Sequence, residues 1–220
     1  MITRLRAFAC QHDKPILECV SGRVMRKSLI WMGTAFGIAL AIAVVVLVLQ
    51  GADNAGTRLA LELTARWSFL LFFLAYAGSA IANLFHIGQL AGRGREFGLA
   101  FAAAHLVHVG LIVWLGHILG RVPLSGGLLL FFLIALFATY LLAGFSFGGV
   151  KTVGPTAWRW IRFLGMNYIL IAFARDFILP VVYPKPSQVN LGHYLFYAPF
   201  MVLSLAAPLL TMLASRPRHA

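Results

Sequence analysis

Two histidines near the middle of a long apolar run are the residues best placed to do chemistry. His105 and His108 lie within the stretch from Gly92 to Gly120, which after Glu96 contains no acidic or basic residue except histidine. A helix of this length, rising about 1.5 Å per residue, can cross a bilayer. Residues three apart project from one helical face. Ionisable side chains at that depth usually face a protein interior, a partner or a cofactor.

Neutral imidazole is the ligand with which many haem proteins bind iron, and a helical bundle supplies a dry slot for the porphyrin. One interpretation of the pair is therefore a haem site with His105 and His108 as candidate iron ligands. The alternative is that the histidines form hydrogen bonds between helices. Small residues beside the pair suit either a flat macrocycle or a closely packed helix: Gly98, Ala102, Ala103 and Ala104.

Arginines in the apolar runs are the next candidates. Arg162 is either an anchor in the inner leaflet beside Trp158 and Trp160, or the ionic partner of a haem propionate or a lipid phosphate. Arg175 is followed at once by Asp176, which predicts a local or interhelical ion pair.

The composition indicates what kind of secondary structure positions these residues. Of the 220 residues, 61% are hydrophobic and only 11% are charged, and the mean hydropathy is +0.88. A soluble domain has about 25% charged residues. The chain is therefore predicted to be an all-α integral membrane protein, a single bundle of six transmembrane helices. The predicted spans run from about Leu29 to Gln50, Arg66 to Leu90, Glu96 to Gly120, Leu124 to Phe147, Thr156 to Tyr183 and His193 to Ser215.

The net charge of +12 reflects orientation in a membrane rather than nucleic-acid binding, because Lys and Arg lie mainly at segment ends. With the N-terminus inside, the inner side holds thirteen of them. The outer side holds Arg58, Arg66, Arg121 and Lys185. This excess predicts that the tails, 1–28 and 216–220, are both cytoplasmic and flank a membrane domain over 29–215. Cys10, His12 and Cys19 in the first tail are too sparse for a standard zinc site.

Several motifs occur in an order typical of one family. They are Thr64-Ala-Arg66-Trp-Ser68, Arg95-Glu-Phe-Gly98-Leu99, His105-Leu-Val-His108, Gly154-Pro155 with Ala157-Trp158, and Gly165-Met-Asn-Tyr168-Ile169. Over about residues 60–180 the chain thus resembles the ferric-reductase-like transmembrane proteins of bacteria. The resemblance implies a haem b electron-transfer protein, or oxidoreductase component, of the bacterial cytoplasmic (inner) membrane. It also implies a separate redox partner, a protein or a quinone. The turn at Gly92–Phe97 departs from the dinucleotide pattern, so no flavin or nicotinamide site is predicted.

The fifth span departs from the family pattern. Members usually continue from the tryptophan as W-x-x-L-H, and that histidine pairs with one on the third helix. Here Arg162 stands at the histidine position, and an always-protonated arginine is a poor iron ligand. Three outcomes stay open: haem with one axial histidine, a second ligand from His86 if the second and third helices are neighbours, or a haem-free scaffold that binds a partner.

Overall fold

The computed structural model describes residues 16–149, 153–184 and 190–215. It confirms an all-α, multi-pass membrane protein, because six of its helices are long and apolar enough to span a bilayer. The tails 1–15 and 216–220, which include Cys10 and His12, lie outside the described residues. The elements are α2 (Ile16–Gln50), α3 (Asn54–Phe85), η1 (Gly88–Leu90), α4 (Gly94–Leu119), α5 (Gly126–Gly144), η2 (Phe145–Gly149), α7 (Pro155–Val182) and α8 (Leu191–Ala214).

Two helices begin earlier than their apolar runs. Helix α2 extends over the polar residues ahead of its membrane span, and no proline interrupts them between Ile16 and Leu29. Helix α3 starts at Asn54 rather than near Arg66, because Asp53 caps it: its carboxylate oxygen Oδ1 accepts a hydrogen bond of 2.9 Å from the amide of Gly56. Arg66 therefore lies three turns inside α3 and not at its end.

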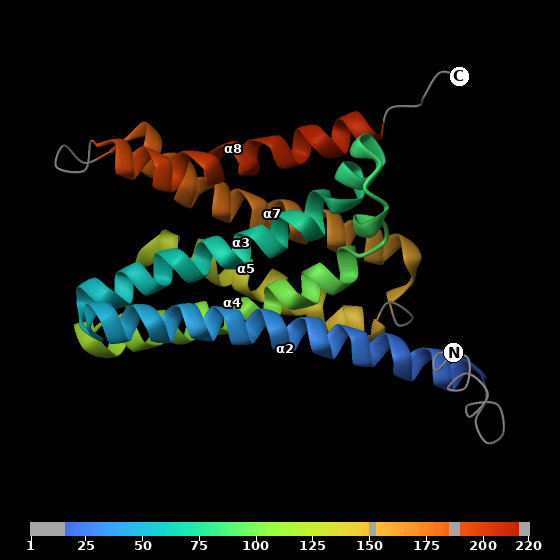
Figure 1. Cartoon of the computed structure of the whole chain (residues 1–220), viewed down its shortest axis with the longest axis horizontal. Helices are drawn as coiled ribbons and strands as arrows, with labels where there is room; N and C mark the ends of the chain where they lie inside the picture. Colours follow the sequence, from blue (N-terminus) through green and yellow to red (C-terminus); the bar gives the residue numbers. More distant parts are fainter. Residues whose placement is uncertain (1–15, 150–152, 185–189, 216–220) are drawn as a thin grey trace.

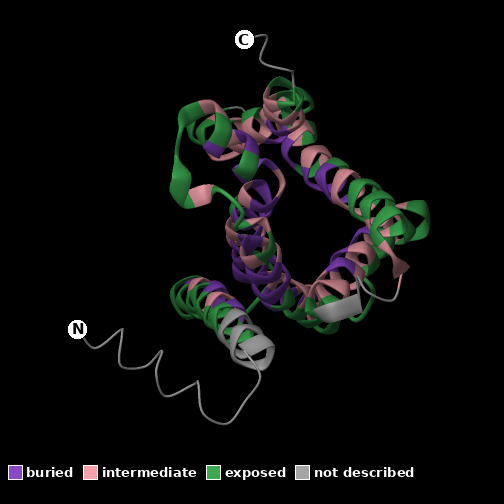
Figure 2. Ribbon diagram, turned by 90° about the vertical axis from the view of Figure 1, so that its right-hand side faces the viewer, coloured by how far each residue is buried: buried purple, intermediate pink, exposed green. Residues whose placement is uncertain are grey.

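Helix α3 is the centre of the bundle. It packs against α2, α4 and α8, while α7 packs against α5 and α8 and the contact between α4 and α5 is slight. The start of α2 and the end of α8 lie at the same end of the molecule (Figure 1). Buried residues line the inward faces of the helices, and exposed ones face outward (Figure 2). The loose α4–α5 pair leaves room for cavities between α4, α5 and α7.

Hydrogen bonds join the helices in pairs, which matters where no water can satisfy a polar group. Trp67 of α3 donates its indole N–H to the carbonyl of Ala35 in α2 at 3.1 Å. Tyr76 of α3 donates to Oδ1 of Asn167 in α7 at 2.9 Å. His193 of α8 lies with Nε2 2.9 Å from the carbonyl oxygen of Pro180 in α7. That carbonyl has no intrahelical donor, since residue 184 is a proline.

Phenylalanines fill the core between α3, α4, α7 and α8. Phe69 and Phe72 of α3 are fully buried. The ring centroid of Phe69 lies 5.0 Å from that of Phe177 and 5.2 Å from that of Phe173, and the ring of Phe72 lies 5.3 Å from that of Phe101. This rigid aromatic layer holds α7 opposite the histidines of α4.

Candidate functional site

Both predicted histidines line one cavity of about 420 Å³, here called the histidine cavity. Helix α4 supplies His105 and His108, α5 supplies Phe132 and Thr139, and α7 supplies Ile169, Ala172 and Phe173. The volume falls in the range of about 300–1,000 Å³ that small-molecule sites occupy. Exposed apolar residues such as Val113 and Leu133 also line it, so its opening faces the lipid side of the bundle.

The two imidazole rings are stacked, with centroids 5.2 Å apart and an angle of 17° between their planes. Two ligands on opposite sides of one iron must point their nitrogens at each other across the porphyrin. Stacked rings one turn apart on a single helix present their faces to each other instead. The pair would therefore provide one iron ligand, rather than two, to a single haem.

Thr64 contacts one ring nitrogen of His108, and the direction of that hydrogen bond depends on the histidine tautomer. The Thr64 hydroxyl has one hydrogen, which it donates to the carbonyl of Ala60 at 2.8 Å or that of Leu61 at 3.1 Å. Its oxygen lies 3.3 Å from Nδ1 of His108, and while the hydroxyl donates to one of these carbonyls this oxygen can only accept from Nδ1–H. This tautomer leaves the Nε2 lone pair available, as in histidines that bind metals and donate the other N–H to a neighbouring oxygen.

His105 lies between aromatic rings and keeps one polar atom unsatisfied. Its ring centroid is 5.4 Å from that of Phe101 and 6.3 Å from that of Phe173. Its Nδ1 is buried without a hydrogen-bond partner among the described residues. A buried polar atom without a partner is costly, so this nitrogen marks a place where a bound group would find a partner.

The predicted ion pair of Arg175 is confirmed, and its partner is the adjacent Asp176 rather than a residue of another helix. Arg175 Nη1 lies 3.0 Å from Asp176 Oδ1, and both residues line the outer part of the histidine cavity. The guanidinium of Arg175 also lies 5.7 Å from the ring centroid of Phe132 on α5. The cavity thus has a charged rim above an apolar interior.

Arg162 lies in a different cavity from the histidines. A second space of about 540 Å³, here called the arginine cavity, is lined by Arg95 and Gly98 of α4, Ser146 of η2, and Trp158 and Arg162 of α7, among others. The two cavities share only the residues of a common wall: Phe101, Thr139 and Ile169. The position where the family pattern has a histidine is therefore not opposite the pair on α4.

His86 is not brought to the histidines either. The second and third spans are neighbours, as a His86 ligand requires. However, His86 is the exposed C-cap of α3, with a left-handed φ of 58°, and lines neither cavity. It lies twenty-two residues beyond Thr64, or about 33 Å along the helix axis.

The small residues of α4 divide between two roles. Ala102, Ala103 and Ala104 are buried and line neither cavity, so they allow close packing of neighbouring helices. Gly98 lines the arginine cavity. These alanines therefore support the alternative in which small residues let neighbouring helices pack closely, rather than make room for a macrocycle.

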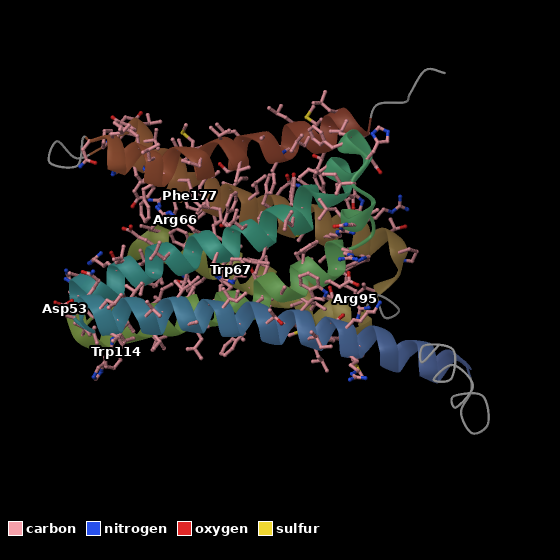
Figure 3. The ribbon with its side chains drawn as sticks, in the orientation of Figure 1. Asp53, Arg66, Trp67, Arg95, Trp114 and Phe177 are labelled. Atoms are coloured by element: carbon pink, nitrogen blue, oxygen red, sulfur yellow. The ribbon has the colours of Figure 1, made fainter. Side chains whose placement is uncertain are left out.

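Two functional candidates become evident only in the structure. Thr64, 44 residues from His108 in sequence, is its hydrogen-bond partner. Arg66 is buried, with 6% of its surface exposed, beside Phe177 between α3 and its neighbours (Figure 3). Both residues belong to the Thr64-Ala-Arg66-Trp-Ser68 motif, so the sequence did single out this segment. The motif does not show that Thr64 contacts His108 or that Arg66 is buried beside Phe177.

The chain matches no protein-family model, no curated protein and no solved structure. Within the described residues, no group of three or more His, Cys, Asp or Glu side chains is placed to hold a bare metal ion. A haem group differs from a bare metal ion, because the porphyrin nitrogens already bind the iron. One protein side chain is therefore enough as a ligand.

Proposed function

We propose that this protein is a haem b electron-transfer component of a membrane oxidoreductase, similar to the ferric-reductase-like transmembrane proteins. The observation that carries the proposal is the hydrogen bond between His108 and Thr64. With the Thr64 hydroxyl donating to its own helix, this contact would hold His108 in the tautomer of an iron ligand, at the wall of an apolar cavity.

The residues fit a flat, mostly apolar group with one protein ligand. His108 would bind the iron through Nε2, His105 would lie beside it with its free Nδ1, and Arg175 at the rim would meet a carboxylate. Haem would supply a one-electron Fe(III)/Fe(II) couple there. The outcome in which one histidine alone would hold the haem is supported by two observations. The imidazole rings of His105 and His108 are stacked, and neither Arg162 nor His86 lines the histidine cavity.

Electrons would have to come from a separate donor and pass to a separate acceptor, a redox protein or a quinone. This follows from the predicted lack of a flavin or nicotinamide site in the glycine turn before α4. The apolar lining of the histidine cavity would exclude water from the redox centre.

A second candidate function is a haem-free membrane scaffold that binds a partner protein. The observations that favour it are the arginine at the family's histidine position and the alanines of α4, which pack helices rather than line a cavity. In that case the histidines serve as interhelical hydrogen-bonding groups.

The spectrum of the purified protein separates the two functions. We expect full-length protein, purified in detergent from haem-replete cells, to give a Soret band and an α band in the dithionite-reduced minus oxidised spectrum, with about one haem per chain. A flat spectrum from well-folded protein would rule out the redox function and favour the scaffold.

We further propose that the protein lies in the bacterial cytoplasmic membrane with both termini in the cytoplasm. Because Arg66 lies buried within α3, only three Lys or Arg remain on the outer side against thirteen on the inner side. In a variant with Cys10 and Cys19 changed to serine, we expect an impermeant maleimide to label S125C in intact cells but not A91C. Labelling of A91C but not of S125C would show that the protein has the opposite orientation.

A further inference from the structure

The arginine cavity is graded from charged to apolar. At one end lie Arg95 in the first turn of α4 and Arg162 two turns into α7. At the other end lie Phe72, Phe101 and Ile169, which approach the middle of the bundle. Arg95 lies at the opposite end of the bundle from Asp53 and Trp114 (Figure 3). This gradient matches the passage from headgroups to acyl chains in one leaflet of a membrane.

The two arginines are available for an anion. Among the described residues, the Arg175–Asp176 pair is the one salt bridge within 4.0 Å, so neither Arg95 nor Arg162 has a carboxylate partner there. Glu96 is next to Arg95 in sequence but does not line the cavity. Ser146 also lines it and donates its hydroxyl hydrogen to the carbonyl of Leu142 at 2.8 Å. Among the residues that line the cavity, the polar end therefore has two cations and no carboxylate.

Glycine keeps this end open. A β-carbon at Gly94 would lie 3.3 Å from the carbonyl oxygen of Ala75 and 3.7 Å from Nη2 of Arg162. A larger side chain would enter the space beside the guanidinium. Trp158 lines the same end, at the depth where tryptophans of membrane proteins sit among the headgroups.

We propose that the arginine cavity binds an anionic phospholipid of the inner leaflet. Its phosphate lies between the guanidinium groups of Arg95 and Arg162, whose planar forks match phosphate oxygens. The first part of one acyl chain occupies the apolar end beside Phe72 and Ile169. A free phosphate ion has the same charge chemistry but would leave that apolar surface in contact with water. This site is separate from the histidine cavity, so the proposal does not depend on haem.

Native mass spectrometry of the full-length protein tests the site. The probes are phosphatidylglycerol and phosphatidylcholine with identical acyl chains. We expect wild type to retain one phosphatidylglycerol and to bind phosphatidylcholine at least about tenfold more weakly. The double variant R95Q/R162Q should lose roughly tenfold or more in affinity for phosphatidylglycerol, since hydrogen bonds to charged groups are lost.

The matched control is R93Q/R159Q. It removes two exposed arginines, Arg93 at the N-cap of α4 and Arg159 on α7, and neither of them lines the cavity. We expect it to bind phosphatidylglycerol like wild type. Equal losses in the two double variants, or no preference of wild type for phosphatidylglycerol over phosphatidylcholine, would overturn the proposal.

Two further measurements separate a lipid from a soluble phosphate. The variant A143F keeps both arginines and fills part of the cavity, which Ala143 lines, so we expect it to weaken binding of phosphatidylglycerol. Millimolar inorganic phosphate should raise the melting temperature of wild type less than phosphatidylglycerol does. Unchanged lipid binding in A143F, or equal stabilisation by inorganic phosphate, would exclude the acyl-chain part and overturn the lipid assignment.

Discussion

Replacing His108 with alanine should abolish the haem spectrum. Its Nε2 is the proposed iron ligand, and no other described histidine can take its place in the same orientation, because the His105 ring lies stacked against it. We expect the affinity for haem to fall by more than roughly 100-fold, since even loss of a hydrogen bond to a metal-binding histidine costs about 10–100-fold. The measurement is the reduced-minus-oxidised spectrum during a haem titration.

Thr64 provides a graded version of the same experiment. Thr64→Val keeps the shape of the side chain but removes the oxygen that accepts the Nδ1–H of His108, so we expect the affinity for haem to fall about 10–100-fold. The matched control is His117→Ala, since His117 is exposed on α4 and does not line the histidine cavity. It should leave the spectrum unchanged.

Imidazole rescue distinguishes loss of the ligand from loss of the fold. Added imidazole should restore the spectrum of His108→Ala, because a small ligand can enter the space that the ring leaves. His105→Ala should keep most of the haem. The opposite result, with haem lost in His105→Ala and retained in His108→Ala, would transfer the ligand role to His105.

Arg66→Ala should destabilise the bundle by about 3 kcal/mol. The Arg66 guanidinium donates to the carbonyl of Glu62 at 2.6 Å and to that of Phe196 on α8 at 3.2 Å. Its central carbon lies 3.4 Å from the ring centroid of Phe196 and 4.6 Å from that of Tyr197. Hydrogen bonds of a charged donor contribute about 1.5–3 kcal/mol each and a desolvated cation–π contact about 2 kcal/mol. The cost of burying the charge offsets part of this sum.

Thermal unfolding in detergent at one scan rate measures the effect. A loss of about 3 kcal/mol corresponds to a decrease in Tm of about 6–12 °C for a chain of this size. The matched control is Arg58→Ala on the same helix. Arg58 is exposed and its Nε donates to Asn54 Oδ1, so its removal should change stability by less than about 0.5 kcal/mol. Equal Tm values for the two variants would show that Arg66 does not hold α3 against α8.

The sequence predicted the number of membrane helices well, but it predicted less well where those helices begin and end. Each apolar run became a membrane-length helix, because a helix satisfies all backbone polar groups within the segment itself. The start of α3 did not follow from hydropathy, because the cap at Asp53 precedes the apolar run. Arg66 was accordingly assigned to the outer side of the membrane, whereas it is buried among the aromatic rings of α8.

By itself, the sequence determined the fold class, the approximate spans and the fact that His105 and His108 share one helical face, since these depend on local hydropathy and the helical repeat. The tertiary structure decided the rest. It paired His108 with Thr64 of α3, and it placed Arg162 in one cavity, the histidines in another and His86 in neither. The physical reason is that these contacts depend on the rotation and depth of each helix against its neighbours, which side-chain packing across the whole bundle sets.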